Sequence, residues 1–102
     1  METYIILMGM TEKGLSEIHK IPDFVESLEQ KLKKRNVILR GFYKVMGETD
    51  YVTIIETEDD KEALASVMAL GKSGFFTTLT LKAYSLLEMR ESLEIYSKNY
   101  KQ

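Results

Sequence analysis

The chain has 102 residues, a length that suits one compact domain. Hydrophobic residues make up 44% of it, and it has 14 basic and 16 acidic side chains and a single proline. This composition excludes collagen-like and disordered classes. The slightly negative net charge provides no basic footprint for nucleic acid or for an anionic membrane surface. Because the chain has no cysteine, disulfides, thiol nucleophiles and thiolate metal sites are excluded, and we expect a cytoplasmic protein.

The first third of the chain predicts a strand followed by a helix. Residues 3–8 form a continuous apolar run that favours a central strand, and Gly9 ends it. The run is too short for a membrane span and lacks the basic segment of a signal peptide. Thr11 can cap a short helical turn, and Pro22 begins a longer helix. Asn36 closes that helix, because Asn tolerates the left-handed conformation.

The middle of the chain predicts a β-hairpin. Strands are expected over 37–46 and 51–56, joined by the loop Gly47-Glu48-Thr49-Asp50. Simple alternation along the first of these strands puts Leu39 and Tyr43 on the same face. Apolar residues occupy both faces of this strand, so the sheet is expected to be covered on both sides.

The next segment predicts a helix and a fourth strand. Asp59 and Glu62 have the spacing of a capping box, which begins the helix. We expect the buried face of this helix to carry Leu64, Val67, Met68 and Gly71. The fourth strand follows over residues 75–84.

A last helix, over residues 86–100, forms the tail of the chain. Its apolar residues recur at spacings of three and four and are Leu86, Met89, Leu93, Tyr96 and Tyr100. The pattern is too short for a coiled coil that is stable alone, so the helix either lies on its own domain or clasps another protomer. We therefore divide the chain into a domain over 1–85 and a helical tail over 86–102.

The order strand, helix, strand, strand, helix, strand indicates the α+β class and a ferredoxin-like βαββαβ fold. Right-handed crossovers then give a four-stranded antiparallel sheet with both main helices on one face. The other face carries too few polar residues to face water, so a second sheet is expected to cover it. A second copy of the chain is the simplest cover, and we predict a homodimer or higher oligomer through the sheet face and the C-terminal helix, with neither nucleic acid nor membrane as a partner.

Three stretches of the sequence give the chain a family resemblance. They are "TEKGLSEIHKIP" over 11–22, "GFYKVMGETDYVTIIE" over 41–56 and "ALASVMALGKSGFFTTLTLKAYS" over 63–85. On these residues the chain resembles the GYD-domain proteins, a family within the dimeric α/β-barrel superfamily. That family usually has Gly, a variable residue, Tyr and Asp in the hairpin. Gly47 and Asp50 match this pattern, whereas Thr49 stands where Tyr is usual.

The resemblance implies a ferredoxin-like protomer whose sheet packs against that of a second copy to form a dimeric barrel, with no agreed reaction. The superfamily includes cofactor-free monooxygenases, haem-dependent enzymes and the ligand-sensing domain of leucine-responsive regulators. A fold shared by such different activities does not choose among them.

The candidate ligand-binding residues lie mostly near the predicted hairpin. They are Asp50, Tyr43, Arg40, Tyr84 and His19. Asp50 either bonds the backbone of its own turn or binds an amino group or cation of a small ligand at the protomer interface. His19 is the single histidine, so a multi-histidine metal site is excluded, and we expect no metal and no cofactor.

The sequence leaves two main functions open. The first is a small-ligand-binding or regulatory module, homo-oligomeric, with the ligand at a protomer interface. The alternative is a cofactor-independent, monooxygenase-like enzyme for a small aromatic or polyketide-like substrate inside the barrel, with His19 or a tyrosine as acid or base. A third possibility, a purely structural role, predicts a barrel interior filled by side chains. The sequence shows no nucleophile–base pair and no phosphate-binding loop.

Overall fold

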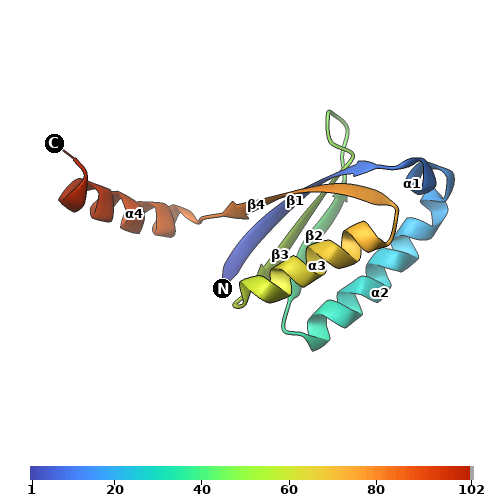
Figure 1. Ribbon diagram of the computed structural model, residues 1–102, viewed down its shortest axis with the longest axis horizontal. Helices are drawn as coiled ribbons and strands as arrows, with labels where there is room; N and C mark the ends of the chain where they lie inside the picture. Colours follow the sequence, from blue (N-terminus) through green and yellow to red (C-terminus); the bar gives the residue numbers. More distant parts are fainter. Residues whose placement is uncertain (102) are drawn as a thin grey trace.

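The computed structural model describes residues 1–101 and contains one four-stranded antiparallel sheet. The strands are β1 (Glu2–Met10), β2 (Ile38–Lys44), β3 (Tyr51–Thr57) and β4 (Phe76–Ala83), in the spatial order β2-β3-β1-β4. The helices are α1 (Glu12–Ser16), the 3-10 turn η1 (Ile18–Lys20), α2 (Ile21–Lys34), α3 (Asp60–Lys72) and α4 (Leu86–Asn99). Helices α2 and α3 lie side by side on one face of the sheet, and α4 extends away from it (Figure 1). The ferredoxin-like fold is confirmed; the last residue of the predicted tail, Gln102, lies outside the described residues.

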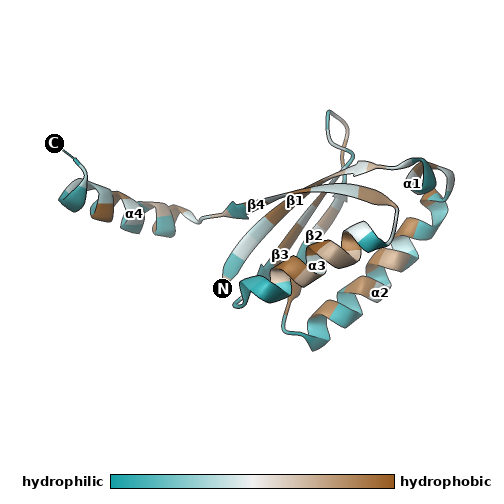
Figure 2. Ribbon diagram, in the orientation of Figure 1, coloured by the Kyte–Doolittle hydropathy of each residue, from teal (hydrophilic) through white to brown (hydrophobic). Residues whose placement is uncertain are grey.

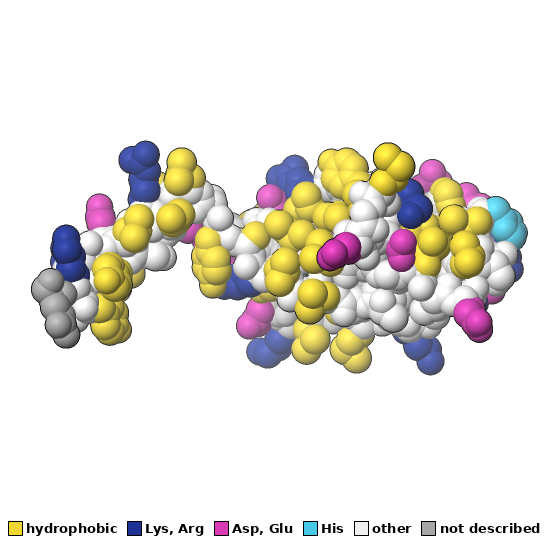
Figure 3. Space-filling view, turned by 90° about the horizontal axis from the view of Figure 1, so that it is seen from above, with side chains coloured by type: hydrophobic (Ala, Val, Ile, Leu, Met, Phe, Trp, Pro, Cys, Tyr) yellow, Lys and Arg dark blue, Asp and Glu magenta, His cyan; other side chains and the backbone are white. Residues whose placement is uncertain are grey.

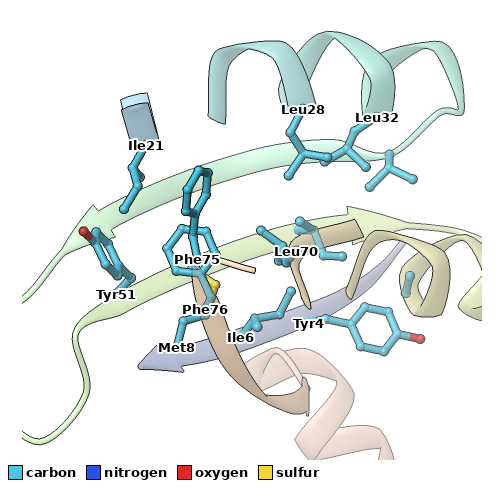
Figure 4. Packing of buried hydrophobic residues seen from close by; sticks show 13 residues of the cluster. Tyr4, Ile6, Met8, Ile21, Leu28, Leu32, Tyr51, Leu70, Phe75 and Phe76 are labelled. Carbon is cyan, nitrogen blue, oxygen red and sulfur yellow. The ribbon is translucent and has the colours of Figure 1, made fainter. Parts of the chain in front are cut away.

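The core lies between this sheet face and the two helices. Alternate residues of β1 and β3 are buried, and Ile6 and Met8 on β1 are 0% exposed. Leu28 and Leu32 of α2 and Leu70 of α3 close the core from the other side (Figure 4). The apolar periodicity of helices and strands thus brings their buried faces together in one layer.

Aromatic rings fill the end of the core near the β2–β3 loop. The ring of Phe76 lies 5.3 Å from that of Tyr51 and 6.1 Å from that of Phe42, between centroids. Phe24 of α2 contacts Phe75 edge to face at 5.5 Å. Such tilted and edge-to-face contacts stabilise the packing beyond the area they bury.

The turn after β1 depends on one threonine and one glycine. The Thr11 hydroxyl accepts from the Gly14 N–H at 3.0 Å and donates to the Gly74 carbonyl at 2.5 Å, so it caps α1 and ties it to the start of β4. A Cβ on Gly14 would lie 2.2 Å from the Phe75 carbonyl oxygen, so only glycine allows this approach. Asn36 has a positive φ of 60°, as the sequence predicts for the end of α2.

The structure corrects the predicted register of β2. A β-bulge between Leu39 and Gly41 shifts the alternation, so Leu39 faces the helices while Tyr43 faces away from them. An extra residue in one strand changes which face the later side chains occupy, and simple alternation does not detect it.

The predicted face of α3 is wrong in part. The buried residues of α3 are Ala63, Ser66 and Leu70, and Val67 packs against the core as predicted, whereas Leu64 and Met68 are 61% and 64% exposed. The small residues Ala63 and Ser66 let α3 approach the sheet, while Leu64 and Met68 face outward. Asp59 caps α3 by accepting from the Lys61 N–H and forms no reciprocal capping box.

Helix α4 stands apart from the rest of the chain, here called the body (residues 1–83). A capping box begins α4, with the Ser85 hydroxyl accepting from the Glu88 N–H at 3.1 Å and the Glu88 carboxylate from the Ser85 N–H at 2.9 Å. No side chain of α4 is buried, and among residues 1–101 no hydrogen bond or ion pair joins it to the body. Hydrophobic side chains recur along its length (Figures 2 and 3). The tail does not lie on its own domain.

Replacing Ile6 by Ala should lower the free energy of unfolding by about 2–5 kcal/mol, because the packed core around it cannot close the cavity. Leu64→Ala removes an aliphatic side chain that is 61% exposed and should change stability by less than about 0.5 kcal/mol. Urea unfolding of both variants measures the difference. Equal losses at the two positions would contradict the assignment of the core.

Candidate functional site

The sheet face opposite α2 and α3 is apolar and uncovered. This open face carries two rows of paired residues that run across the sheet. The first row is Tyr43, Val52, Leu7 and Leu79, and the second is Gly41, Ile54, Ile5 and Leu81. The central strands leave their residues half-buried, whereas Leu79 and Leu81 on the edge strand β4 are 60% and 45% exposed. Contiguous apolar surface of this kind is typical of an interaction site.

A hollow of about 670 Å³ lies at one end of the open face, beneath the β2–β3 loop. Its lining residues come from three strands and the loop and are Leu7, Met8, Gly9, Val45, Met46, Gly47, Glu48, Thr49, Val52, Thr77, Thr78 and Leu79. Glu48 is the single charged residue among these lining residues. The volume is within the range of small-ligand pockets, about 300–1,000 Å³.

Asp50 and Thr49 fasten the loop to the end of β1. The Asp50 carboxylate oxygen Oδ2 accepts from the Met10 N–H at 2.8 Å, and the Asp50 N–H donates to the Met8 carbonyl at 2.9 Å. The Thr49 hydroxyl donates to the same carbonyl at 3.0 Å. In residues 1–101 the second carboxylate oxygen, Oδ1, has no protein hydrogen-bond partner. Asp50 therefore bonds the backbone with one oxygen and leaves the other available.

Asp50 is not one of the lining residues, but its carboxylate lies next to Gly9, which is, and so borders the rim of the hollow. A Cβ built on Gly9, which lines the hollow, would be 3.8 Å from Asp50 Oδ2 and 2.8 Å from the Thr77 hydroxyl. Glycine at this place in β1 thus keeps open the space between Asp50 and Thr77.

Of the other predicted site residues, Tyr43 lies nearest to the hollow. It belongs to the row that includes Leu7 and Val52, two residues of the lining. Its ring covers Gly41, where a Cβ would be 2.5 Å from the ring atom Cε2. Asp50 and Tyr43 therefore occupy the same half of the open face.

Arg40, Tyr84 and His19 lie elsewhere. Arg40 is at the β-bulge, where its Nε is 2.8 Å from the Glu56 carboxylate in an exposed ion pair. Tyr84 follows β4 at the opposite end of the strands from the loop, with the Lys82 ammonium 5.3 Å from its ring centre. His19 is exposed in η1, beyond the turn after β1. The five predicted residues thus do not form one cluster.

The sequence interpretation missed most of the lining residues. Thr77, Met46 and Gly9 carry no catalytic signature, and they come together only when β1, β4 and the loop meet in space. Contrary to the prediction from the sequence, Gly9 does not end the first strand but lies within β1, and a glycine inside a strand often marks a close approach. Thr49 stands where the family usually has tyrosine. Its hydroxyl donates a hydrogen bond to the Met8 carbonyl near the end of β1, which is a structural role for the loop.

The other side of the same loop adjoins the core through Tyr51. Burial raises the pKa of the Tyr51 phenol above its ordinary value of 10.0, and the neighbouring Asp50 carboxylate adds to the shift. The phenol remains protonated and donates towards the Met10 sulfur at 3.6 Å. The Lys44 ammonium lies 4.9 Å from the Tyr51 ring centre, so this side of the loop is held by packing and a cation–π contact.

A second groove of about 500 Å³ lies between α2 and β2 and is mostly apolar, but none of the five predicted site residues lines it. Among residues 1–101, no group of three or more His, Cys, Asp or Glu side chains is placed to hold a metal ion. None of the helices described has the length and apolarity that a membrane crossing requires.

The GYD domain model matches residues 4–93 of this chain. The chain belongs to the GYD-domain family. The match begins in β1 and ends within α4, so it includes the hairpin and the whole sheet.

Three known proteins are similar to this chain. The glutamine synthetase and cystathionine beta-lyase binding protein of Thermus thermophilus is 28% identical over 90 residues, which is 87% of this chain and 95% of that protein. The crystal structure of FFRP-DM1 has a TM-score of 0.59 at 22% identity and covers 82% of this chain and 100% of its own. The dehydrochlorinase TftG of Burkholderia phenoliruptrix, in complex with 2,5-dihydroxybenzoquinone, has a TM-score of 0.57 at 17% identity, over 82% and 94%. At these identities the two structures show the shared fold alone.

Replacing Asp50 by Ala should lower the free energy of unfolding by about 1–3 kcal/mol, because the Met10 N–H loses a charge-assisted hydrogen bond. Asp50→Asn keeps an acceptor oxygen, so it should lower the free energy of unfolding by less than Asp50→Ala does. Glu48→Ala changes an exposed residue of the same loop and should alter the free energy of unfolding by no more than about 0.5 kcal/mol. Chemical denaturation of the three variants tests this order, and an unchanged stability for Asp50→Ala would contradict the structural role.

Proposed function

We propose that this chain is a homodimeric binding module that holds a small amine, such as an amino acid, in the hollow beside the β2–β3 loop, where two open faces meet. The single observation that carries the proposal is this hollow at the edge of an uncovered apolar sheet face, with a carboxylate oxygen of Asp50 left without a partner in residues 1–101. The family membership and the relative named as a binding protein support a binding or regulatory module.

The open face supports the dimer. Leu79 and Leu81 are large, exposed and on the edge strand, next to the half-buried Ile5 and Leu7. Two sheets that pack face to face lie about 10 Å apart, which allows the rows of one copy to interdigitate with those of the other. A symmetric dimer covers both apolar faces at once.

The charge around the hollow supports an amine as ligand. Glu48 lies in the lining and Asp50 at the rim, and no Lys or Arg is among the residues that line the hollow. Carboxylates in a partly enclosed site form strong charge-assisted hydrogen bonds with an ammonium group. Leu7, Val52 and Leu79 supply an apolar floor for the rest of the ligand.

The enzymatic alternative, with His19 or a tyrosine as acid or base, has less support. His19 and Tyr84 lie in η1 and at the opposite end of β4 from the hollow, and Tyr43, the tyrosine nearest to the hollow, has no acid or base partner among the hydrogen bonds of residues 1–101. The structural likeness to TftG is a likeness of fold.

Leu81→Glu should convert the dimer to a monomer, because it places a charge in the middle of the apolar interface. Thr80→Glu is the matched control, since Thr80 is an exposed residue of the same strand that points to the other face. Molar mass by light scattering at micromolar concentration measures the effect. A wild-type protein that is already a monomer would refute the dimer.

Amino acids at millimolar concentration should raise the melting temperature of the wild-type protein, because a ligand at 100 times its Kd adds about 2.7 kcal/mol to the stability of the folded form. The shift should disappear in Asp50→Asn and remain in Glu12→Gln, an exposed carboxylate change on α1. If none of the twenty amino acids shifts the melting temperature, the ligand class is wrong.

A further inference from the structure

Helix α4 carries an apolar seam that its own chain leaves uncovered. The seam residues are Leu86, Met89, Leu93 and Tyr96 of α4 and Tyr100, which directly follows the helix, and their exposed fractions run from 50% to 71%. Leu87 and Ile95 are also exposed, at 67% and 59%, but lie outside this seam. An isolated helix of 14 residues is marginal in water, because nucleation is costly and only packing of the apolar side compensates for it. The stability of α4 therefore requires a partner molecule.

The flanks of the seam indicate what this partner is. Arg90 and Ser97 lie along one side of the seam, and Ser92 and Asn99 lie along the other. Flanks rich in acidic or basic residues would favour a partner of opposite charge. Among these four flanking residues only Arg90 is charged, so two identical helices repel each other little. We infer that α4 pairs in an antiparallel orientation with α4 of a second copy of this chain, and that this contact joins dimers into a larger assembly.

The orientation follows from the sizes of the seam side chains. Leucine and methionine occupy the first part of the seam, and Tyr96 and Tyr100 occupy the last part. A parallel pair would place tyrosine against tyrosine at one end and smaller residues together at the other, so its width would vary. The antiparallel pair places Leu93 opposite Tyr96 and Met89 opposite Tyr100, so each of these layers combines a large and a smaller side chain, while Leu86 lies beyond the paired region. Thioether–aromatic contact and opposed helix dipoles both favour this arrangement.

The same orientation excludes the two copies of a single sheet-packed dimer. The body lies at the N-terminal end of α4 (Figure 1), and the helix is about 21 Å long at 1.5 Å per residue. An antiparallel pair therefore holds its two bodies at opposite ends, where their open faces cannot meet. This inference rests on the proposed dimer, because two arms on each dimer supply the avidity that one short helix pair lacks. The expected product is a tetramer or a larger ring of dimers.

Mass measurement of the full chain by light scattering tests the pairing. The wild-type protein should be a tetramer or larger, and Leu93→Glu should reduce it to a dimer. The matched control is Ile95→Glu, which makes the same kind of change on the side of α4 away from the seam and should keep the wild-type mass. Leu81→Glu should give a monomer.

The outcomes separate this inference from the proposed function. A wild-type dimer that Leu93→Glu leaves unchanged would overturn the α4 pairing and leave the sheet-packed dimer standing. Equal dissociation by Ile95→Glu and Leu93→Glu would also overturn it, because the seam would then have no special role.

Disulfide trapping tests the orientation of the two helices. Because the chain has no cysteine of its own, only the introduced cysteines can form disulfides. Single variants Leu93→Cys and Tyr96→Cys, mixed and oxidised, should cross-link mainly to each other. Cross-links that form mainly within each variant would indicate a parallel pair and overturn the proposal. The pair Met89→Cys and Tyr100→Cys provides a second test with the same expected preference, should the first pair weaken the assembly.

Discussion

Helices α2 and α3 cover one face of a sheet that is apolar on both. Burial of Ile6 and Met8 on the covered face stabilises the fold, while Ile5 and Leu7, which alternate with them in β1, face the other side. A strand with apolar residues on both sides gains the full free energy of apolar burial only when both sides are removed from water. The proposed function follows from this constraint, since it places both the ligand and the second copy of the chain on the second face.

Asp50 connects the stability of the fold to the chemistry of the hollow. One carboxylate oxygen, Oδ2, bonds the end of β1, and this bond holds the carboxylate in place beside Gly9. A side chain that is held by the backbone loses little conformational entropy when it binds a ligand. The two roles considered for this residue from the sequence, turn former and ligand group, are therefore compatible in one geometry. The geometry supports the first directly, and the second remains a proposal.

The sequence predicted the order of the elements well, because each has a clear period and a clear boundary residue such as Thr11 or Asn36. It failed where one residue changes the geometry. The bulge beside Arg40 adds a residue without any composition signal, so the two faces of β2 were assigned wrongly. In α3 the apolar residues Leu64 and Met68 face solvent while Ala63 and Ser66 are buried, so hydrophobicity alone placed the buried face incorrectly. The hollow was not predictable in detail, since its lining comes from segments that are distant in sequence.

The separation of α4 from the body has a consequence for how such a protein evolves. No side chain of α4 is buried or belongs to the core within residues 1–101, so the folding of the sheet domain places little constraint on substitutions along the helix. Selection can therefore change the seam, and with it the number of subunits, while the hollow and its loop stay intact. Relatives in this family could differ in quaternary structure although their sheet domains superimpose.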